Sequence, residues 1–283
     1  MKKIGDFTNA IIPFLVAVGI QLLVAASITF LYGFVTAINL FSSGEGNHDT
    51  IENAIFDSIN PEVQLGITAI VAIVCLIIFG IWYKRISLSE EKSDKIKRFS
   101  IKTIIVIILL GIGLQISLSF ILNIIASIKP DWFNNYGQVM EGLGRGSTLL
   151  SAIYIGLIAP ISEEFIFRGV TLKKAQKVMP FIGANILQAI LFGVYHGNLV
   201  QGVYAFILGL FLGFVCYQLQ SLLASILLHM VINISGILFG FISVDSVFYT
   251  TGIWGVVSIA GIAAAIVGTF ILRKKEKTSE DLY

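Results

Sequence analysis

The sequence predicts an all-α fold, a polytopic transmembrane bundle of about eight helices with both termini in the cytoplasm. Long uncharged apolar runs carry this prediction, because each approaches or exceeds the ~20 residues that a bilayer-spanning helix needs. They cover residues 11–41, 65–83, 103–128 and 199–243. Composition agrees, since hydrophobic residues make up 56% of the chain and charged residues only 13%, against about 25% charged residues in typical globular domains.

The same pattern divides the chain into eight spans and three regions. At about 30 apolar residues the first span is too long for the core of a signal peptide, so we expect it to be retained. We expect residues 1–146 to hold the first three helices, residues 147–243 a core of four, and residues 244–283 the last helix and a basic tail. The expected spans are residues 11–41, 65–83, 102–128, 147–168, 181–196, 198–218, 222–243 and 252–272.

Basic residues are unevenly distributed between the two sides of these spans. The segment 42–64 is acidic and contains no Lys or Arg, whereas the segment 84–102 is rich in both. All 19 basic residues except Lys129 and Arg145 fall on the side of the second segment, with Arg168 taken to mark the inner end of its span. The positive-inside rule places this side in the cytoplasm. We expect a multi-pass protein of a prokaryotic inner or plasma membrane that binds no nucleic acid.

Two carboxylates and two imidazoles lie within the predicted spans of the C-terminal half. They belong to Glu163, Glu164, His196 and His229. An ionisable group at the centre of a bilayer costs about 2.5–3.5 kcal/mol on insertion scales, so such groups indicate a functional site. The alternative for each, taken alone, is a packing role with a polar partner.

The spacing of these residues along their helices predicts a different role for each side chain. Glu164 and Arg168 are four residues apart with the acid first, the favourable order for an ion pair on one helix face. Glu163 points about 100° away and has no partner on its own helix, which suits a general base. Gln188, Phe192 and His196 share one face of the fifth span, and His229 and Asn233 share one face of the seventh. A base, two imidazoles and a carboxamide from three helices suit hydrolysis of an amide bond.

Three motifs in this order resemble those of the CAAX-protease and bacteriocin-processing family, also called CPBP or Abi, and in particular the type 2 CAAX prenyl endopeptidases. The motifs are Glu163-Glu164-x-x-x-Arg168, Phe192-x-x-x-His196 and His229-x-x-x-Asn233. The resemblance implies an intramembrane endopeptidase in which Glu163 and His196 activate water while His229 and Asn233 stabilise the oxyanion. Glu164, Arg168 and Phe192 are expected to have structural or orienting roles.

The cofactor is left open by the sequence. The chain lacks the H-E-x-x-H spacing typical of a zinc protease. Glu163, His196 and His229 could still supply the three protein ligands of a catalytic zinc. We therefore expect either water activated by a glutamate or a metal site made of these three residues.

Other functions are considered alongside proteolysis. A non-catalytic membrane immunity or regulatory partner protein of the same fold would bind a peptide without cutting it, and a transporter would use the acids for proton coupling. The full set of catalytic side chains favours an endopeptidase that acts on membrane-associated peptides or proteins, with bacteriocin processing or self-immunity as candidate settings. Its expected partners are the lipid bilayer and a peptide or membrane-protein substrate.

The depth of the fifth span poses a geometric problem. A straight helix from Pro180 would place His196 about 24 Å from the inner surface, whereas Glu163, counted from Arg168, would lie roughly 8–12 Å deep. These groups cannot meet if the span starts at the interface and runs perpendicular to the membrane. We therefore expect the turn at Gly197 and Asn198 to lie within the membrane thickness and to line a wet cavity.

Overall fold

The computed structural model describes residues 2–44, 60–89, 99–142 and 148–241, together with the single residues 54, 259 and 263. Within these segments the regular structure is helical and no strand occurs, so the predicted all-α class is confirmed. The expected last span at 252–272 and the basic tail after it lie outside the described residues, apart from two single positions. The predicted division into three regions stays a prediction.

Seven separate helices and one composite helix make up the described bundle. The composite helix runs over Leu149–Gln176. A short 3₁₀ turn, η1 (Pro130–Trp132), follows α4. The separate helices are α1 (Lys2–Ser43), α3 (Pro61–Ser89), α4 (Ile101–Ile128), α5 (Phe133–Gly142), α9 (Phe181–Tyr195), α10 (Leu199–Leu219) and α11 (Leu222–Phe241).

The composite helix leaves the α-helical hydrogen-bonding register in two places, where it becomes π-helical. It consists of α6 (Leu149–Ile153), the π-helical segment η3 (Tyr154–Ile158), α7 (Ala159–Glu164), the π-helical segment η4 (Phe165–Leu172) and α8 (Lys173–Gln176). Pro160 lies just after η3 and has no N–H to give to the ladder, which favours a local departure from the α register. π-Helical turns are rare and often mark functional sites. Both turns flank the segment that carries the paired acids.

Six of the described helices are long and apolar enough to cross a membrane, which confirms a multi-pass membrane protein. The fifth predicted span differs, because α9 has only 15 residues and is about 22 Å long. It falls short of the ~30 Å hydrocarbon core. The helix ends early because the chain turns back at Gly197. The total of eight spans, the orientation of the termini and the depth of this turn stay predictions.

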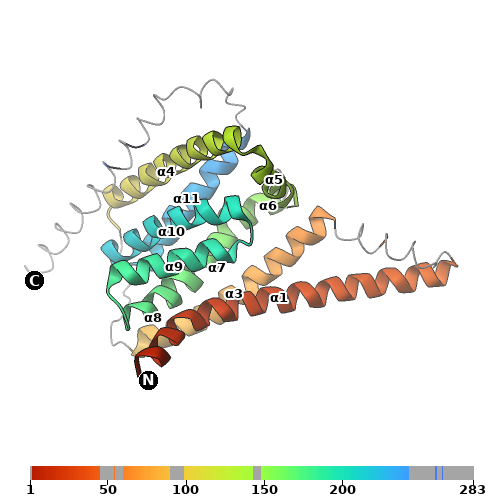
Figure 1. Ribbon diagram of the computed structural model, residues 1–283, viewed down its shortest axis with the longest axis horizontal. Helices are drawn as coiled ribbons and strands as arrows, with labels where there is room; N and C mark the ends of the chain where they lie inside the picture. The colour runs from red at the N-terminus through yellow and green to blue at the C-terminus, as the bar shows by residue number, and fades with distance from the viewer. Residues whose placement is uncertain are drawn as a thin grey trace, which may run out of the picture.

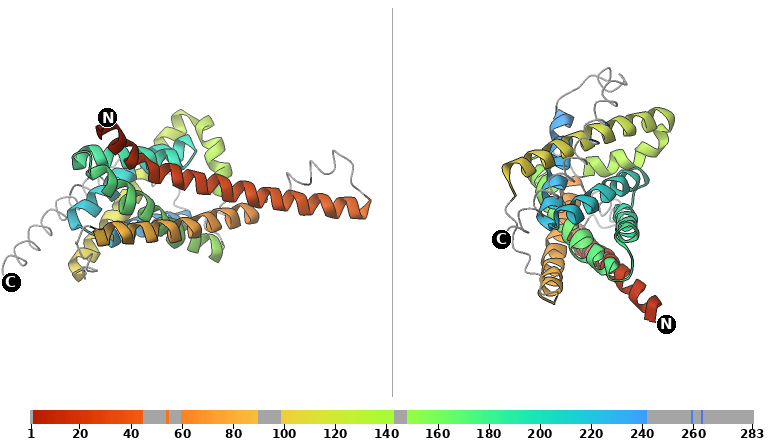
Figure 2. Two further views of the ribbon diagram at one scale, coloured as in Figure 1. Left: turned by 90° about the horizontal axis from the view of Figure 1, so that it is seen from below. Right: turned by 90° about the vertical axis from the view of Figure 1, so that its left-hand side faces the viewer.

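The composite helix lies at the centre of the packing, in contact with α3, α9 and α11, while α4 packs on α11 and α9 packs on α10 (Figure 1). α1 contacts α3 and then extends well beyond the other helices (Figure 2). Gly209 and Gly213 on α10 face α9 so closely that a Cβ atom at either one would meet Ala189 or Asn185. Their four-residue spacing is typical of close helix contacts in membranes.

One expectation about the inner end of this helix is wrong. Arg168 does not end the span as predicted, because the helix continues to Gln176 and Arg168 is only 1% exposed. The reason is its ion pair with Glu164, which makes a buried position tolerable. Lys173 and Lys174 lie near the end of the helix instead, with their ammonium groups over aromatic rings of α3.

Candidate active site

The adjacent carboxylates on α7 occupy different environments. The side chain of Glu164 is fully buried, whereas that of Glu163 is 16% exposed and lines a cavity of about 560 Å³. Successive residues of a helix point about 100° apart. A helix that buries one carboxylate between its neighbours therefore turns the other toward the cavity.

Glu164 is the centre of a buried polar network. Its Oε1 atom accepts a hydrogen bond from Nη1 of Arg168 at 2.8 Å and lies 2.9 Å from Nδ1 of His229. Arg168 also donates from Nη2 to the carbonyl of Gly209 at 3.2 Å, and its guanidinium lies 4.5 Å from the ring centroid of Phe192. The structure thus contains the ion pair that the four-residue spacing predicts, and the network around it links four helices, the composite helix, α9, α10 and α11.

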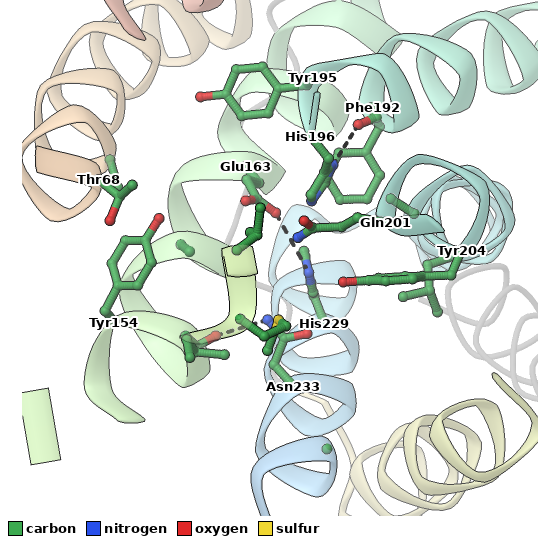
Figure 3. Close-up of a pocket in the computed structure, with 18 of the residues that line it drawn as sticks. Thr68, Tyr154, Glu163, Phe192, Tyr195, His196, Gln201, Tyr204, His229 and Asn233 are labelled. Carbon is green, nitrogen blue, oxygen red and sulfur yellow. Dashed lines mark hydrogen bonds and ion pairs between the residues drawn. The ribbon is translucent and has the colours of Figure 1, made fainter. Parts of the chain in front are cut away.

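This network fixes the orientation of His229. Since Glu164 is paired with Arg168, its carboxylate can only accept, and Nδ1 of His229 must carry the shared hydrogen. Nε2 of His229 then faces the cavity, where it lies 3.7 Å from Oε2 of Glu163 (Figure 3). That separation is too long for a direct hydrogen bond. In the neutral ring Nε2 is an acceptor, and it becomes a donor only when the imidazole takes up a second proton.

His196 is held at the C-terminal end of α9. Its Nδ1 atom lies 2.8 Å from the carbonyl oxygen of Phe192, which can only accept, so Nδ1 carries a hydrogen. The lone pair of the neutral ring is therefore on Nε2, in the cavity. Gly197 ends the helix with a φ of +65°, a left-handed conformation that glycine adopts without steric cost.

Asn233 is bonded to the backbone of the composite helix. Its Nδ2 atom donates to the carbonyl oxygen of Ile155 at 2.8 Å. In η3 the N–H of Ala159 donates to the carbonyl of Tyr154, five residues earlier, so the next donor in that register would be residue 160. Pro160 has no N–H, and Asn233 supplies the missing hydrogen bond. One hydrogen of the Asn233 amide is thus engaged, and the second remains for another acceptor.

The other two side chains that share a face of α9 separate into different roles. The ring of Phe192 packs edge-on against both histidines, with centroid distances of 4.8 Å to His196 and 5.8 Å to His229. Gln188 lies away from the cavity and donates to the carbonyl of Gly209 at 2.8 Å. Phe192 therefore contacts the site directly, while Gln188 joins α9 to α10.

All four predicted catalytic residues, Glu163, His196, His229 and Asn233, line the same cavity. The structure brings them together from three separate helical elements, as the motifs predicted. Glu164 and Arg168 lie behind the cavity wall. The cavity also receives side chains from α1, α3, α4, α5 and α10, and its volume lies in the range typical of ligand-binding sites.

Several polar residues of the cavity were not singled out from the sequence. Gln201 and Tyr204 enter it from the first turns of α10, and Tyr154 and Tyr195 enter it from the composite helix and α9 (Figure 3). A signal was present for the first pair. They are polar side chains three residues apart in an otherwise apolar helical start, so they share one face.

The arrangement does not match a preformed metal site. Within the described segments, no three His, Cys, Asp or Glu side chains lie close enough together to hold a metal ion, and this includes the predicted trio of Glu163, His196 and His229. Each histidine does have its Nδ1 fixed by an acceptor, as metal-binding histidines often do. The Glu163 carboxylate and the two rings nonetheless do not converge on one point where an ion could bind all three.

Comparison with known proteins assigns the segment that contains this site. A family model described as Type II CAAX prenyl endopeptidase Rce1-like matches residues 145–235, about a third of the chain. No curated protein and no solved structure matches the chain. The matched segment includes all three sequence motifs and all four predicted catalytic residues. Residues 145–235 are therefore similar to the Rce1-like type II CAAX prenyl endopeptidase family, the family that the three motifs resemble.

Proposed function

We propose that this protein is an intramembrane endopeptidase that hydrolyses peptide bonds in membrane-associated peptides or proteins. The family match supports a CAAX-protease-like membrane hydrolase. One observation carries the assignment of residues: a partly exposed carboxylate, that of Glu163, faces Nε2 of His229 across 3.7 Å in a cavity that His196 also lines.

In this proposal Glu163 and His196 activate water. The carboxylate accepts one proton of the water molecule, and Nε2 of His196, which holds a lone pair because Nδ1 is bonded to the Phe192 carbonyl, accepts a hydrogen bond from the same water. The water oxygen attacks the carbonyl carbon of the scissile bond. Positioned general bases of this kind contribute about 10²–10⁴-fold to a rate.

The remaining steps conserve protons. The C–N bond breaks as Glu163 passes the water-derived proton to the leaving nitrogen. The acyl product forms as a carboxylic acid and gives its proton to the new amine, so the final products are a carboxylate and an ammonium group. His229, in its doubly protonated form, and the second amide hydrogen of Asn233 are the proposed donors to the oxyanion. Glu164 and Arg168 act as positioning residues, because they set which nitrogen of His229 faces the cavity.

The lining of the cavity indicates the chemistry of the substrate. Among the described residues that line it, Glu163 is the one carboxylate and none is Lys or Arg. The other walls are aliphatic side chains, tyrosines and carboxamides. Such walls suit an uncharged, apolar peptide segment whose backbone needs hydrogen-bond partners. A membrane-associated leader peptide, bacteriocin or regulatory membrane protein would meet this requirement.

A pair of variants tests the proposal. The protein in liposomes is given a farnesylated CAAX peptide with a quenched fluorophore, and membranes of cells that carry each variant are compared by proteomics. We expect Glu163→Gln to abolish cleavage of every substrate, and the exposed Glu62→Gln on α3 to leave it unchanged. If proteolytic products are identical with and without Glu163, the chain is instead a non-catalytic immunity or regulatory partner protein.

A further inference from the structure

The two side chains proposed as oxyanion donors are both partly committed. Asn233 gives one amide hydrogen to Ile155, and His229 gives its Nδ1 hydrogen to Glu164. His229 can then donate into the cavity only as an imidazolium. A neutral donor that already points at the reacting centre would stabilise the developing charge without any change of protonation.

Gln201 has such a placement. It lies in the first turn of α10, where its backbone N–H donates to Oδ1 of the N-cap residue Asn198 at 3.1 Å. Its side chain lines the cavity and points toward Glu163 and His229 (Figure 3). The carboxamide is not folded back over the N-cap, as it would be in a capping box.

The packing of α10 fixes this direction. Gly202 approaches Gly193 of α9 so closely that a Cβ atom on Gly202 would lie 3.1 Å from the Gly193 carbonyl oxygen. With that face of α10 against α9, the next face presents Gln201, Tyr204 and Leu208 to the cavity, at the three- to four-residue spacing of one helix side. Tyr204 lies beside the Gln201 carboxamide and packs its ring edge-on to Tyr136 at 6.2 Å.

We propose that Gln201 is a further catalytic residue, whose side-chain amide donates a hydrogen bond to the carbonyl oxygen of the scissile bond and to the oxyanion formed from it, with Tyr204 positioning the carboxamide. This inference rests on the proposed endopeptidase function. It adds a donor from α10 to those from α11, so the oxyanion is held from two helices.

The test compares substitutions at Gln201 in the full-length protein in liposomes, with the same farnesylated fluorogenic peptide. Gln201→Met keeps the length of the side chain and removes its donors, so we expect kcat to fall about 10²–10³-fold and KM to change less than about threefold. Gln201→Glu keeps the shape and replaces the amide by acceptors, and we expect at least the same loss. Gln176→Leu, an exposed glutamine outside the cavity, should behave as the wild type.

A second measurement separates a donor from a packing residue. A phosphinic peptide carries a tetrahedral P–O⁻ group at the position of the oxyanion, so its inhibition constant should rise with Gln201→Met by about the factor by which kcat/KM falls. If kcat of both Gln201 variants stays within about threefold of the wild type, or if only KM rises, the inference is wrong. The proposed function fails separately, if Glu163→Gln still cleaves the peptide.

Discussion

His229 and Glu164 share a hydrogen bond of 2.9 Å between Nδ1 and Oε1, at the same carboxylate oxygen that accepts from Arg168 at 2.8 Å. The bond joins α11 to α7 in a fully buried position. Its effect is to point the second nitrogen of His229 at Glu163. The two adjacent acids therefore act on the two nitrogens of one ring, one from behind the cavity wall and one from within the cavity.

This relationship predicts how Glu164 and Arg168 contribute to stability. Glu164→Gln leaves the guanidinium of Arg168 buried without its counter-charge, and we expect the free energy of unfolding in detergent to fall by about 3–5 kcal/mol. The double variant Glu164→Gln/Arg168→Met removes both charges and should recover most of that loss. Thermal unfolding in detergent measures both.

The same variants separate stability from orientation. The double variant should remain inactive, because its neutral carboxamide no longer dictates which nitrogen of His229 carries the hydrogen. Recovery of both stability and peptidase activity would contradict a positioning role for Glu164. Loss of stability that is equal in the single and double variants would contradict the ion-pair argument.

The hydrogen bond between Asn233 and Ile155 predicts a coupling with Pro160. Asn233→Ala leaves the partly buried carbonyl of Ile155 without this partner, and we expect it to lower the free energy of unfolding by about 1–3 kcal/mol. Pro160→Ala restores a backbone N–H at the position that would donate to Ile155 in the π register. In that background the same Asn233 substitution should cost less.

A double-mutant cycle measures the coupling from four unfolding curves. Additive effects of the two substitutions would show that Pro160 does not create the need for Asn233. Peptidase activity tests the proposed catalytic role of Asn233 separately. If its second amide hydrogen donates to the oxyanion, activity should stay low whenever Asn233 is replaced, with or without Pro160.

Metal chelation provides a third prediction. Because the described residues present no group of three suitable ligands, we expect peptidase activity in liposomes to stay within about twofold after incubation with a strong zinc chelator. The matched control is the same preparation dialysed without chelator. Loss of activity that added zinc restores would mean that Glu163, His196 and His229 rearrange into a shared site.

The sequence was sufficient to predict the parts of the site that depend on local spacing. The Glu164 and Arg168 ion pair and the grouping of Phe192 with His196 follow from residues four apart on apolar helices. Burial of polar groups in lipid is costly enough that such residues must meet one another. Chemistry and composition therefore identified the carboxylate and the two imidazoles that line the cavity, but not its tyrosines.

The remaining features depend on contacts between distant segments. The π-helical register of η3 leaves a carbonyl that is satisfied by Asn233, 78 residues away in the chain. The direction of Gln201 depends on how α10 rotates against α9, which is set by the contact between Gly193 and Gly202. Neither the register nor the rotation is encoded by the local period of hydrophobic residues.

That glycine contact gives the last prediction. A Cβ atom on Gly193 would lie 2.6 Å from the backbone carbonyl oxygen of Gly202, so Gly193→Ala must push α9 away from α10. The shift occurs three residues before His196 and next to Gln201. We expect a loss of stability of about 1–3 kcal/mol, as in other overpacked sites, and a fall in peptidase activity of at least about tenfold.

Gly80→Ala on α3 is the matched control for Gly193→Ala, because a Cβ atom there meets nothing within 4 Å. An alanine is favoured over glycine in a helix by up to about 1 kcal/mol, so this variant should be as stable as the wild type or slightly more stable, with full activity. Thermal unfolding in detergent and cleavage of the fluorogenic peptide measure both quantities. A Gly193→Ala protein with normal activity would show that the close approach of the two helices does not hold His196 and Gln201 at the reacting centre.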